Sequence, residues 1–341
     1  MTLKHAIVIT SINGRHPVLR DIERLAATNN WDMIVAGDTT SKGFCETRYF
    51  RYLSVAEQVG SSFHLGRLAP VRNYCRKNFA YLEAIKRGAE VIVETDDDNL
   101  PTKNFFRSRV LTCDRHIADV KGWVNVFRYF TDNKMIWPRG YDLSKIKVPP
   151  PSFVDLELKL TTCPVQCGMI NGDPDVDAVY RLLFSVPFEF SYEDREVCLG
   201  KDAVCTFNSQ NTAFFKSAFP LMYLPATPYF RETDIVRSLV IQRILSSTNE
   251  RVLFHGANIT QLRNSHDLMD DLRQETRLYA HIGRLCSKLK NVRFGKGASI
   301  RVKLHKCYEV FHECGIINPI EHDMIEAWCD DLSEIGSLDG L

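Results

Sequence analysis

Three consecutive aspartates, Asp96, Asp97 and Asp98, closely follow the apolar run at residues 91–93. Adjacent carboxylates repel one another, so a folded chain tolerates them best where a cation or solvent offsets their charge. Mg²⁺ and Mn²⁺ prefer hard oxygen ligands and often share their coordination with substrate phosphates. We therefore expect Mn²⁺ or Mg²⁺ here, with Asp96 and Asp98 nearest the metal and the ribose of a nucleotide, and Asp97 between them.

Two other interpretations of this acidic run remain open. It is a solvated loop if nothing binds there, and a strand-end Asp-x-Asp also serves as the nucleophile of some phosphatases. The phosphatase motif ordinarily ends the first strand of its domain, whereas two strand-like runs, 6–12 and 31–37, precede it here. The position therefore favours a metal that bridges the protein and a diphosphate.

Two strand–helix–strand units are predicted to position these carboxylates. Residues 6–12 and 31–37 are apolar runs typical of strands buried on both faces, and residues 17–27 between them have helical spacing. A second unit follows, with a helix over 72–87 and a strand over 90–94. Such units imply a parallel sheet with right-handed crossovers. The acidic run then lies at the carboxyl edge of the sheet, where open α/β sheets bind ligands.

Further residues at this edge are candidates for binding a nucleotide. The first two strands should be neighbours, so the side chains that follow them can hold a nucleoside, with Asp38 accepting a bond from a base N–H. Arg72 opens the predicted helix and can pair with phosphate. The alternatives are a plain turn residue at Asp38 and a surface arginine at Arg72. The predicted set is Thr10, Asn13, Arg15, Asp38, Arg72 and Asn73, together with Asp96 and Asp97.

The second half of the chain offers candidates for acid–base chemistry. Asp234 and Glu232 lie at the predicted start of a helix over 233–245. A carboxylate there can act as general base toward an acceptor hydroxyl, as an inverting transferase requires, although Asp234 could also simply cap the helix. His266 is a candidate third metal ligand, and the alternative is a structural histidine.

Two charged segments are open to a functional or a structural interpretation. A helix is predicted to begin at Asp173 and Pro174, where the helix dipole would stabilise Asp173, Asp175 and Asp177. The functional alternative is that residues 171–175 form a loop on the acceptor side. The basic cluster at residues 293–306 could bind the phosphate of a lipid-linked acceptor or a polyanionic glycan, or form a solvated basic face.

Composition narrows the class of protein. The 341 residues are 45% apolar, and 43 Lys and Arg balance 42 Asp and Glu, so nothing global argues for a nucleic-acid partner. There is no run of about 18 apolar residues that predicts a membrane span, and no signal-peptide pattern. Eleven scattered cysteines are typical of reduced thiols. We expect a cytoplasmic protein with at most peripheral contact with the inner membrane face.

Several longer motifs resemble the glycosyltransferase-like domain of the STELLO family. They are the segments 207–212, 219–225 and 231–243, the stretch 171–177 and the helix 78–88, and the resemblance covers about residues 5 to 275. The family is assigned a GT-A-like fold. The three aspartates also resemble the acidic motif of the reversibly glycosylated polypeptides, the UDP-arabinopyranose mutases, which use UDP-sugars and a divalent metal. Unlike STELLO proteins, this sequence shows no N-terminal membrane anchor, and its acidic motif is more regular than theirs.

These observations predict an α/β, GT-A-like fold, Rossmann-like, with a mostly parallel sheet and helices on both faces. The nucleotide-sugar and acceptor domain would cover residues 1–266, and a helical C-terminal appendage residues 267–341. The predicted activity is metal-dependent transfer of a sugar from a nucleotide donor, preferably a UDP-sugar, to a glycan or lipid-linked acceptor hydroxyl in surface polysaccharide synthesis. A UDP-sugar mutase and a non-catalytic scaffold that binds a glycan or partner are the alternatives.

Overall fold

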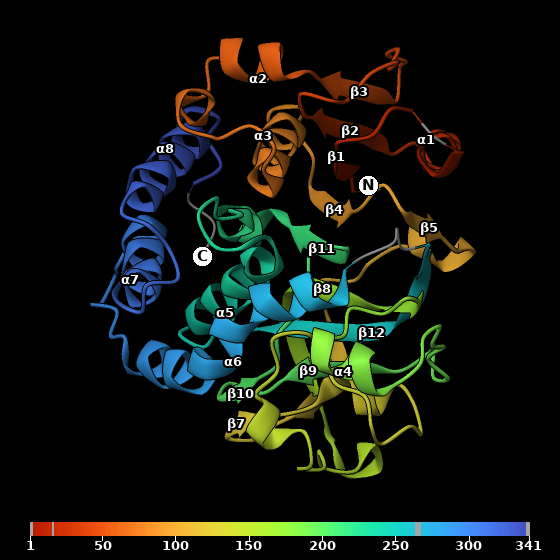
Figure 1. Ribbon diagram of the computed structural model, residues 1–341, viewed down its shortest axis with the longest axis vertical. Helices are drawn as coiled ribbons and strands as arrows, with labels where there is room; N and C mark the ends of the chain where they lie inside the picture. Colours follow the sequence, from red (N-terminus) through yellow and green to blue (C-terminus); the bar gives the residue numbers. More distant parts are fainter. Residues whose placement is uncertain (1–2, 16, 263–266, 339–341) are drawn as a thin grey trace.

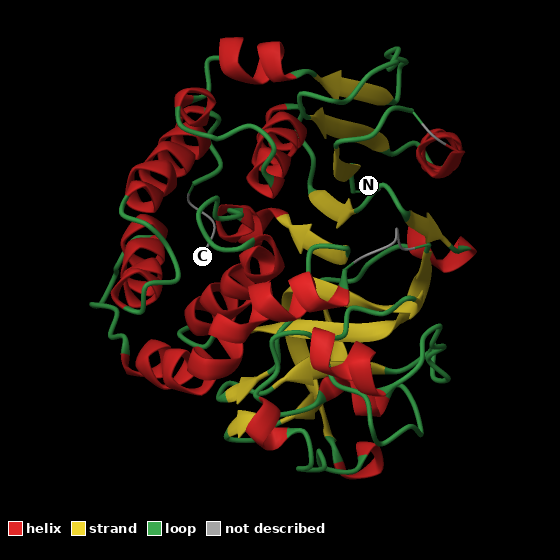
Figure 2. Ribbon diagram, viewed as in Figure 1, coloured by secondary structure: helices red, strands yellow, loops and turns green. Residues whose placement is uncertain are grey.

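The computed structural model describes residues 3–15, 17–262 and 267–338. A ten-stranded sheet runs through the molecule, and helices cover it on two sides (Figures 1 and 2). The last two helices, dark blue in Figure 1, lie along the left flank, and the final one lies beside the N-terminal part of the chain. In the described part of the chain, no helix has the length and apolarity needed to cross a membrane.

The first half of the sheet is parallel throughout. Its strands are ordered β3-β2-β1-β4, and the pairs β3–β2, β2–β1 and β1–β4 are all parallel. These strands are β1 (His5–Ser11), β2 (Asp32–Gly37), β3 (Phe50–Leu53) and β4 (Val91–Thr95), and the helices between them are α1 (Pro17–Thr28), α2 (Val55–Gly60) and α3 (Lys77–Lys86). Both predicted strand–helix–strand units are confirmed, and β1, β2 and β4 end at one edge.

Alternate residues of β1 face opposite layers of the molecule. Ala6 and Val8 belong to the larger apolar core, with residues of α3 and α5 (Thr233–Leu245), whereas Ile7 and Ile9 pack in a second core with residues of α1. Because helices cover both faces of the sheet, polar and apolar residues cannot alternate along β1, and residues 6–9 are all apolar.

The second half of the sheet mixes strand directions. β11 (Asn211–Phe215) lies antiparallel between β4 and β8 (Glu157–Gly172). β8 pairs with both β6 and β12, and β9 joins those two strands, so four strands close into a ring. The other strands are β5 (Asn99–Pro101), β6 (Thr112–Ala118), β7 (Gly122–Trp123), β9 (Glu196–Leu199), β10 (Ala203–Val204) and β12 (Glu250–Gln261). The sheet agrees with the predicted α/β, GT-A-like class, parallel at its N-terminal end and mixed beyond it.

The C-terminal helices share the core of the sheet domain. They are α6 (Leu268–Asn291), α7 (Ile300–Glu313) and α8 (Ile320–Glu334). Phe311 of α7 and Trp328 of α8 are fully buried in the same apolar core as Ile241 of α5. The helical character of this part is confirmed, and it packs directly on α5; the domain boundary at residues 266/267 stays a prediction.

Two helix starts differ from the sequence-based prediction. The helix expected from Asp173 begins only at Ala178, as α4 (Ala178–Leu183), and Asp177 is its N-cap. Asp175 forms an ion pair with Arg139, which holds the segment before α4 in a loop. The helix expected from Arg72 begins at Lys77, since Arg72 has a φ of 53° and a left-handed residue cannot start an α-helix. A short 3₁₀ turn, η2 (Tyr74–Arg76), precedes it.

One ion pair is completely buried between β4 and α5. Arg237 of α5 pairs with Glu94 of β4, and both side chains are 0% exposed. One guanidinium nitrogen donates to Glu94 Oε2 over 2.9 Å, and Tyr81 of α3 donates to the same oxygen. A buried charge without its partner is costly, so this pair fixes how α5 and α3 sit on β4.

Glu94→Gln is expected to lower the free energy of unfolding by about 3–5 kcal/mol, because it leaves the Arg237 charge buried without a counter-ion. Urea unfolding at neutral pH measures the loss. Glu90→Gln, four residues earlier at an exposed position, is the control and should cost under about 1 kcal/mol. Equal losses in the two variants would show that the buried pair does not hold these elements together.

Candidate functional site

A pocket with a volume of about 590 Å³ opens at the carboxyl ends of β1, β2 and β4. Its other wall comes from the start of α5 and from loops of the second half of the chain. The structure brings most of the predicted site residues to this pocket, namely Thr10, Asn13, Asp38, Arg72, Asn73, Asp96, Asp97, Asp98 and Asp234. Residues more than 200 positions apart in sequence thus meet in one cavity.

Two described residues of the predicted set do not line the pocket. Arg15 forms an ion pair with Glu23 of α1. Glu232 is fully buried, where its carboxylate binds Arg277 of α6 and accepts a bond from the Tyr229 backbone N–H. His266 lies outside the described residues.

The first carboxylate of the acidic run is held by a buried lysine. Lys77 Nζ lies 2.7 Å from Asp96 Oδ1, and the Tyr74 hydroxyl donates to the same oxygen over 2.7 Å. The lysine side chain is 0% exposed and also donates to the carbonyl oxygens of Thr95 and Ser209. Burial raises the pKa of Asp96, and the Lys77 charge opposes that rise. Lys77 therefore offsets part of the negative charge of the run.

The second carboxylate is bound by the end of β1. The Ser11 hydroxyl donates to Asp97 Oδ2 over 2.5 Å, and Asn13 Nδ2 donates to the same atom over 3.0 Å. The loop after β1 and the acidic run after β4 are therefore joined by side-chain bonds as well as by the ladder of the two strands.

The third carboxylate has an oxygen that is available to a ligand. Gln261 Nε2 at the end of β12 donates to Asp98 Oδ2 over 3.2 Å, whereas Asp98 Oδ1 is buried and makes no hydrogen bond with the described residues. Burial raises the pKa of Asp98 to about 6, and the neighbouring Asp96 charge adds to the shift. A buried carboxylate oxygen without a hydrogen-bond partner among the described residues, in a run of three aspartates, suits a hard divalent cation such as Mn²⁺ or Mg²⁺ as a ligand.

The side of the pocket near β2 joins Asp38 to the loop before α3. Asp38 is buried, and its Oδ2 accepts a bond of 3.2 Å from the Asn73 backbone N–H. Asn73 in turn donates its side-chain amide to the carbonyl of Ala226. The exposed Arg72 lies beside them in its left-handed conformation and lines the pocket. This side presents one guanidinium to an anionic ligand.

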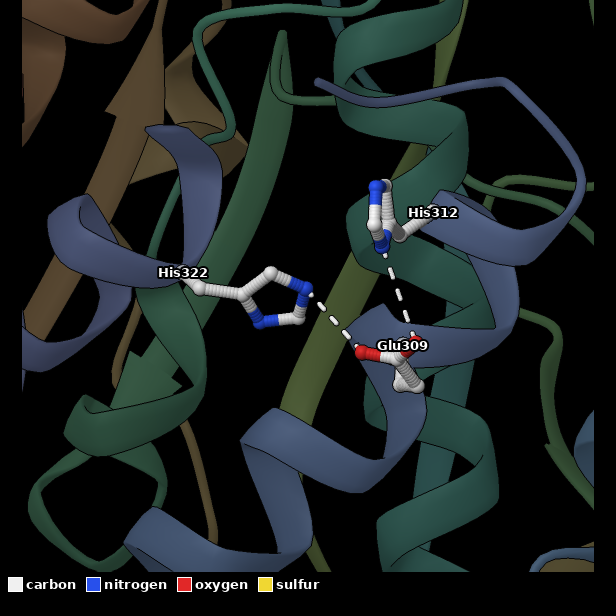
Figure 3. Close-up of side chains that lie close together, drawn as sticks. All are labelled: Glu309, His312 and His322. Atoms are coloured by element: carbon white, nitrogen blue, oxygen red, sulfur yellow. Dashed lines mark ion pairs between the residues drawn. The ribbon is translucent and has the colours of Figure 1, made fainter. Parts of the chain in front are cut away.

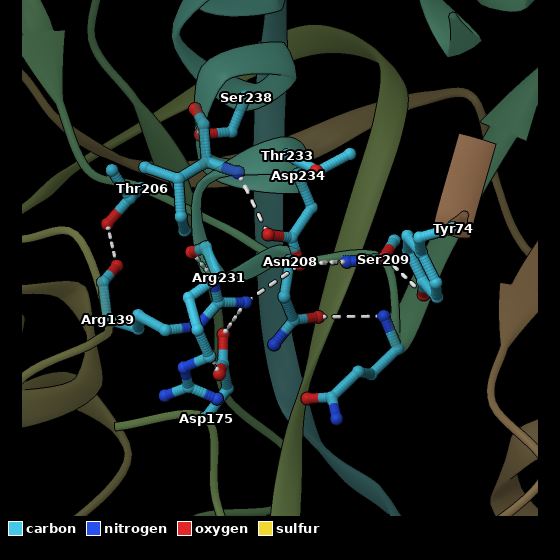
Figure 4. Close-up of polar contacts among 12 residues, drawn as sticks. Tyr74, Arg139, Asp175, Thr206, Asn208, Ser209, Arg231, Thr233, Asp234 and Ser238 are labelled. Carbon is cyan, nitrogen blue, oxygen red and sulfur yellow. Dashed lines mark hydrogen bonds and ion pairs between the residues drawn. The ribbon is translucent and has the colours of Figure 1, made fainter. Parts of the chain in front are cut away.

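The opposite wall is organised around Arg139, as Figure 4 shows. Its guanidinium binds Asp175 with two bonds, of 2.8 and 3.1 Å, and Asp234 Oδ2 with one of 2.8 Å. Asp234 Oδ2 also accepts a bond of 3.3 Å from the Ser209 backbone N–H. All three charged side chains line the pocket and are nearly buried, so their positions are fixed before any ligand arrives.

Sequence analysis missed Lys77, Tyr74 and Arg139. Tyr74 and Lys77 are three apart at the start of a helix, but Lys77 stands between Arg76 and Asn78, so the local pattern did not mark it as a buried residue. Arg139 lies in an irregular stretch without periodic apolar residues, so the sequence offered no signal that it would meet Asp234.

Asp98→Asn is expected to stabilise the metal-free protein by about 1–2 kcal/mol at pH 8. In the folded protein the pKa of Asp98 is about 6, above its usual value of 3.8. Ionising Asp98 therefore opposes folding at every pH above 6, and it has no effect at a pH well below 3.8, where the carboxyl group is protonated in both states. Urea unfolding at pH 8 and pH 4 should show a gain at pH 8 that disappears at pH 4. Asp114→Asn, on an exposed part of β6, is the control. A gain of the same size at both pH values would contradict the ionisation argument.

Comparison with known proteins shows similarity to the STELLO glycosyltransferases. The STELLO glycosyltransferases model matches residues 231–338, which run from the pocket wall through α8. The probable glycosyltransferases STELLO2 and STELLO1 of Arabidopsis thaliana are 24% and 23% identical to this chain, over 96% and 93% of it. The match reaches beyond the expected residues 5 to 275. The chain spans 45% and 43% of the length of these two relatives, less than half of each.

Solved structures with a similar course of the chain include glucosyl-3-phosphoglycerate synthase from Mycobacterium tuberculosis in complex with Mg²⁺ and UDP. Its TM-score is 0.42 and its sequence identity 11%, and the match covers 84% of this chain and 80% of that one. S. aureus TarS 1–349 in complex with UDP-GlcNAc has a TM-score of 0.41 and 11% identity, covering 98% and 80%. Likeness at this level establishes neither ligand nor activity. The similarity over nearly the whole sequence confirms the resemblance that the motifs indicated: this chain is similar in sequence to the STELLO glycosyltransferases.

Proposed function

We propose that this chain is a metal-dependent glycosyltransferase that moves a sugar from a nucleotide donor, preferably a UDP-sugar, to a hydroxyl group of a glycan or lipid-linked acceptor. The observation that carries the proposal is Asp98, whose Oδ1 is buried without a hydrogen-bond partner among the described residues, at the carboxyl edge of the sheet. The similarity to STELLO glycosyltransferases supports the reaction class. The 590 Å³ pocket is large enough for a nucleotide-sized ligand.

Asp98 and its neighbour Asp96 would hold Mn²⁺ or Mg²⁺, which when bound stabilises the charge of a departing diphosphate. Gln261 orients Asp98 through one oxygen, and the other oxygen, which has no hydrogen-bond partner among the described residues, would bind the metal. Lys77 keeps Asp96 in place and lowers the repulsion within the run. His266 stays a predicted third ligand.

The nucleotide would lie along the ends of β1 and β2. Asp38 and Asn73 are tied together there by a backbone hydrogen bond, which gives the base and ribose a fixed wall. Arg72 would pair with the diphosphate, because its exposed guanidinium lines the same pocket and phosphate oxygens accept its parallel N–H groups. Thr10 and Asn13 complete this side of the pocket.

The acceptor would approach the wall that carries Asp234. Its carboxylate is oriented by Arg139 and by the Ser209 backbone, so it can accept the proton of an acceptor hydroxyl as that oxygen attacks the anomeric carbon. Glu232 is engaged by Arg277, which leaves Asp234 as our candidate base for an inverting reaction. Asp175, on the other side of the same guanidinium, helps to fix it.

A lipid-linked or polyanionic acceptor, used in surface polysaccharide synthesis at the inner face of a membrane, remains part of the proposal. It is supported by the basic segment before and within α7, where Arg293, Lys296 and Lys306 are exposed. Arg301 of the same segment is engaged by Glu326 and Asp330 of α8, so the basic surface is smaller than the sequence suggests.

Calorimetric titration of UDP, GDP and CMP tests the donor site. One nucleotide, UDP by preference, should bind in Mn²⁺, lose binding in EDTA and lose at least about tenfold in affinity in Asp98→Ala, since Asp98 would hold the metal that offsets the charge of the diphosphate. Asp114→Ala should bind as the wild type does. Asp234→Asn should retain nucleotide binding, because it lies on the acceptor wall.

Other outcomes of this titration separate the alternatives. A protein that binds UDP with metal and converts a UDP-sugar to an isomer without any acceptor is a mutase. A protein that binds none of the three nucleotides under any condition is not a transferase of this kind, and the scaffold interpretation would then replace the proposal.

A further inference from the structure

Three side chains capable of binding a metal meet between α7 and α8, far from the acidic run in sequence. Glu309 and His312 lie one helical turn apart on α7, and His322 of α8 faces them (Figure 3). His312 Nδ1 is 3.6 Å from Glu309 Oε1, and His322 Nε2 is 3.1 Å from Glu309 Oε2. All three ligand atoms lie within 4.8 Å of one another.

These spacings are close to those of a tetrahedral coordination shell. Atoms bound about 2.0–2.2 Å from a tetrahedral zinc ion lie about 3.3–3.6 Å apart. The separations of 3.6 and 3.1 Å, each to a different oxygen of Glu309, lie at or near that range, so side-chain rotations would bring the three groups around one ion. The ring nitrogens concerned, Nδ1 of His312 and Nε2 of His322, already point toward the carboxylate (Figure 3).

A second observation concerns the His322 ring itself. Its Nε2 atom is enclosed by protein and makes no hydrogen bond of proper geometry with the described residues, although Glu309 is near. An enclosed ring nitrogen aimed into a cluster of ligands is the arrangement that a metal ion satisfies. The other His322 neighbour, His305, lies one turn before Glu309 with its ring stacked on that of His322, 5.9 Å away, and binds Glu326.

We propose that Glu309, His312 and His322 form a zinc site that clips α7 to α8. Two imidazoles and one carboxylate form a ligand set that zinc uses with a water molecule in the fourth position. Imidazole ligands favour zinc and similar transition metals over Mg²⁺ and Mn²⁺, which prefer oxygen ligands alone. The site is therefore chemically distinct from the acidic run at Asp96–Asp98, and it does not depend on the proposed transferase activity.

The place of this site in the fold gives it a structural role. His322 follows Glu321, which is fully buried and accepts hydrogen bonds from the Ala226 and Thr227 backbone N–H groups and from the Thr227 hydroxyl. Those residues lead directly into the pocket wall that begins at Phe230. An ion at His322 would thus hold the turn of α8 that anchors this wall.

Zinc titration of untagged, metal-free protein tests the proposal, in an Asp98→Asn background that removes the other candidate metal site. We expect one zinc ion per chain, and at least about tenfold weaker binding in His312→Gln and in His322→Gln, because each loses one of three ligands. His64→Gln is the matched control, since His64 forms an exposed histidine–glutamate pair with Glu334 elsewhere on α8. It should bind zinc with unchanged affinity.

Co²⁺ provides an independent measurement. The wild-type chain should give the visible absorption bands of four-coordinate Co²⁺, and zinc should displace them; Glu309→Gln and His322→Gln should lose them while keeping the far-UV circular dichroism of the folded protein. Absence of zinc binding, or binding that persists unchanged in both histidine variants, would overturn the proposal and leave the cluster as ion pairs alone.

Discussion

The buried pair of Glu94 and Arg237 determines how the two halves of the pocket meet. Glu94 lies on β4, two residues before the acidic run, and Arg237 lies on α5, three residues after Asp234. Each side chain is 0% exposed, so neither charge can be satisfied by water. The pair therefore sets the distance and the rotation between the strand that presents the aspartates and the helix that presents the opposite wall.

Within the acidic run, each carboxylate has a different environment. Asp96 has a buried ammonium group, Asp97 has a hydroxyl and an amide, and Asp98 has one amide donor and a remaining buried oxygen. Three identical residues in a row thus differ in charge compensation, because each points to a different strand end or helix. The groups around Asp96 and Asp97 offset much of the repulsion within the run. The remaining repulsion falls mainly on Asp98.

The sequence predicted the elements that depend on local pattern. The apolar run of β1 and that of β4 were found because both faces of these strands are covered, and the acidic run followed at the sheet edge as expected. The antiparallel placement of β11 between β4 and β8 could not be foreseen, since periodicity describes one segment and says nothing about its partner.

Most of the described candidate residues line the pocket, and two do not. Arg15 and Glu232 have the right charge, yet each had a nearby ion-pair partner, Glu23 and Arg277, that only the fold reveals. Arg139 is the opposite case, because no pattern in the surrounding sequence predicts that it lines the pocket. Its role depends on contacts with Asp175 and Asp234, which are 36 and 95 residues away in the sequence.

The bonds of Glu321 also have a consequence for the order of events during synthesis. The loop of residues 223–227 donates to this one carboxylate, which is made almost 100 residues later in the chain. Until the ribosome has released α8, the backbone N–H groups of Ala226 and Thr227 have no protein acceptor, and the wall that follows them lacks its anchor. The pocket can therefore be completed only after α8 has been made, so a nascent chain that stops before α8 carries the acidic run without a finished cavity to receive a ligand.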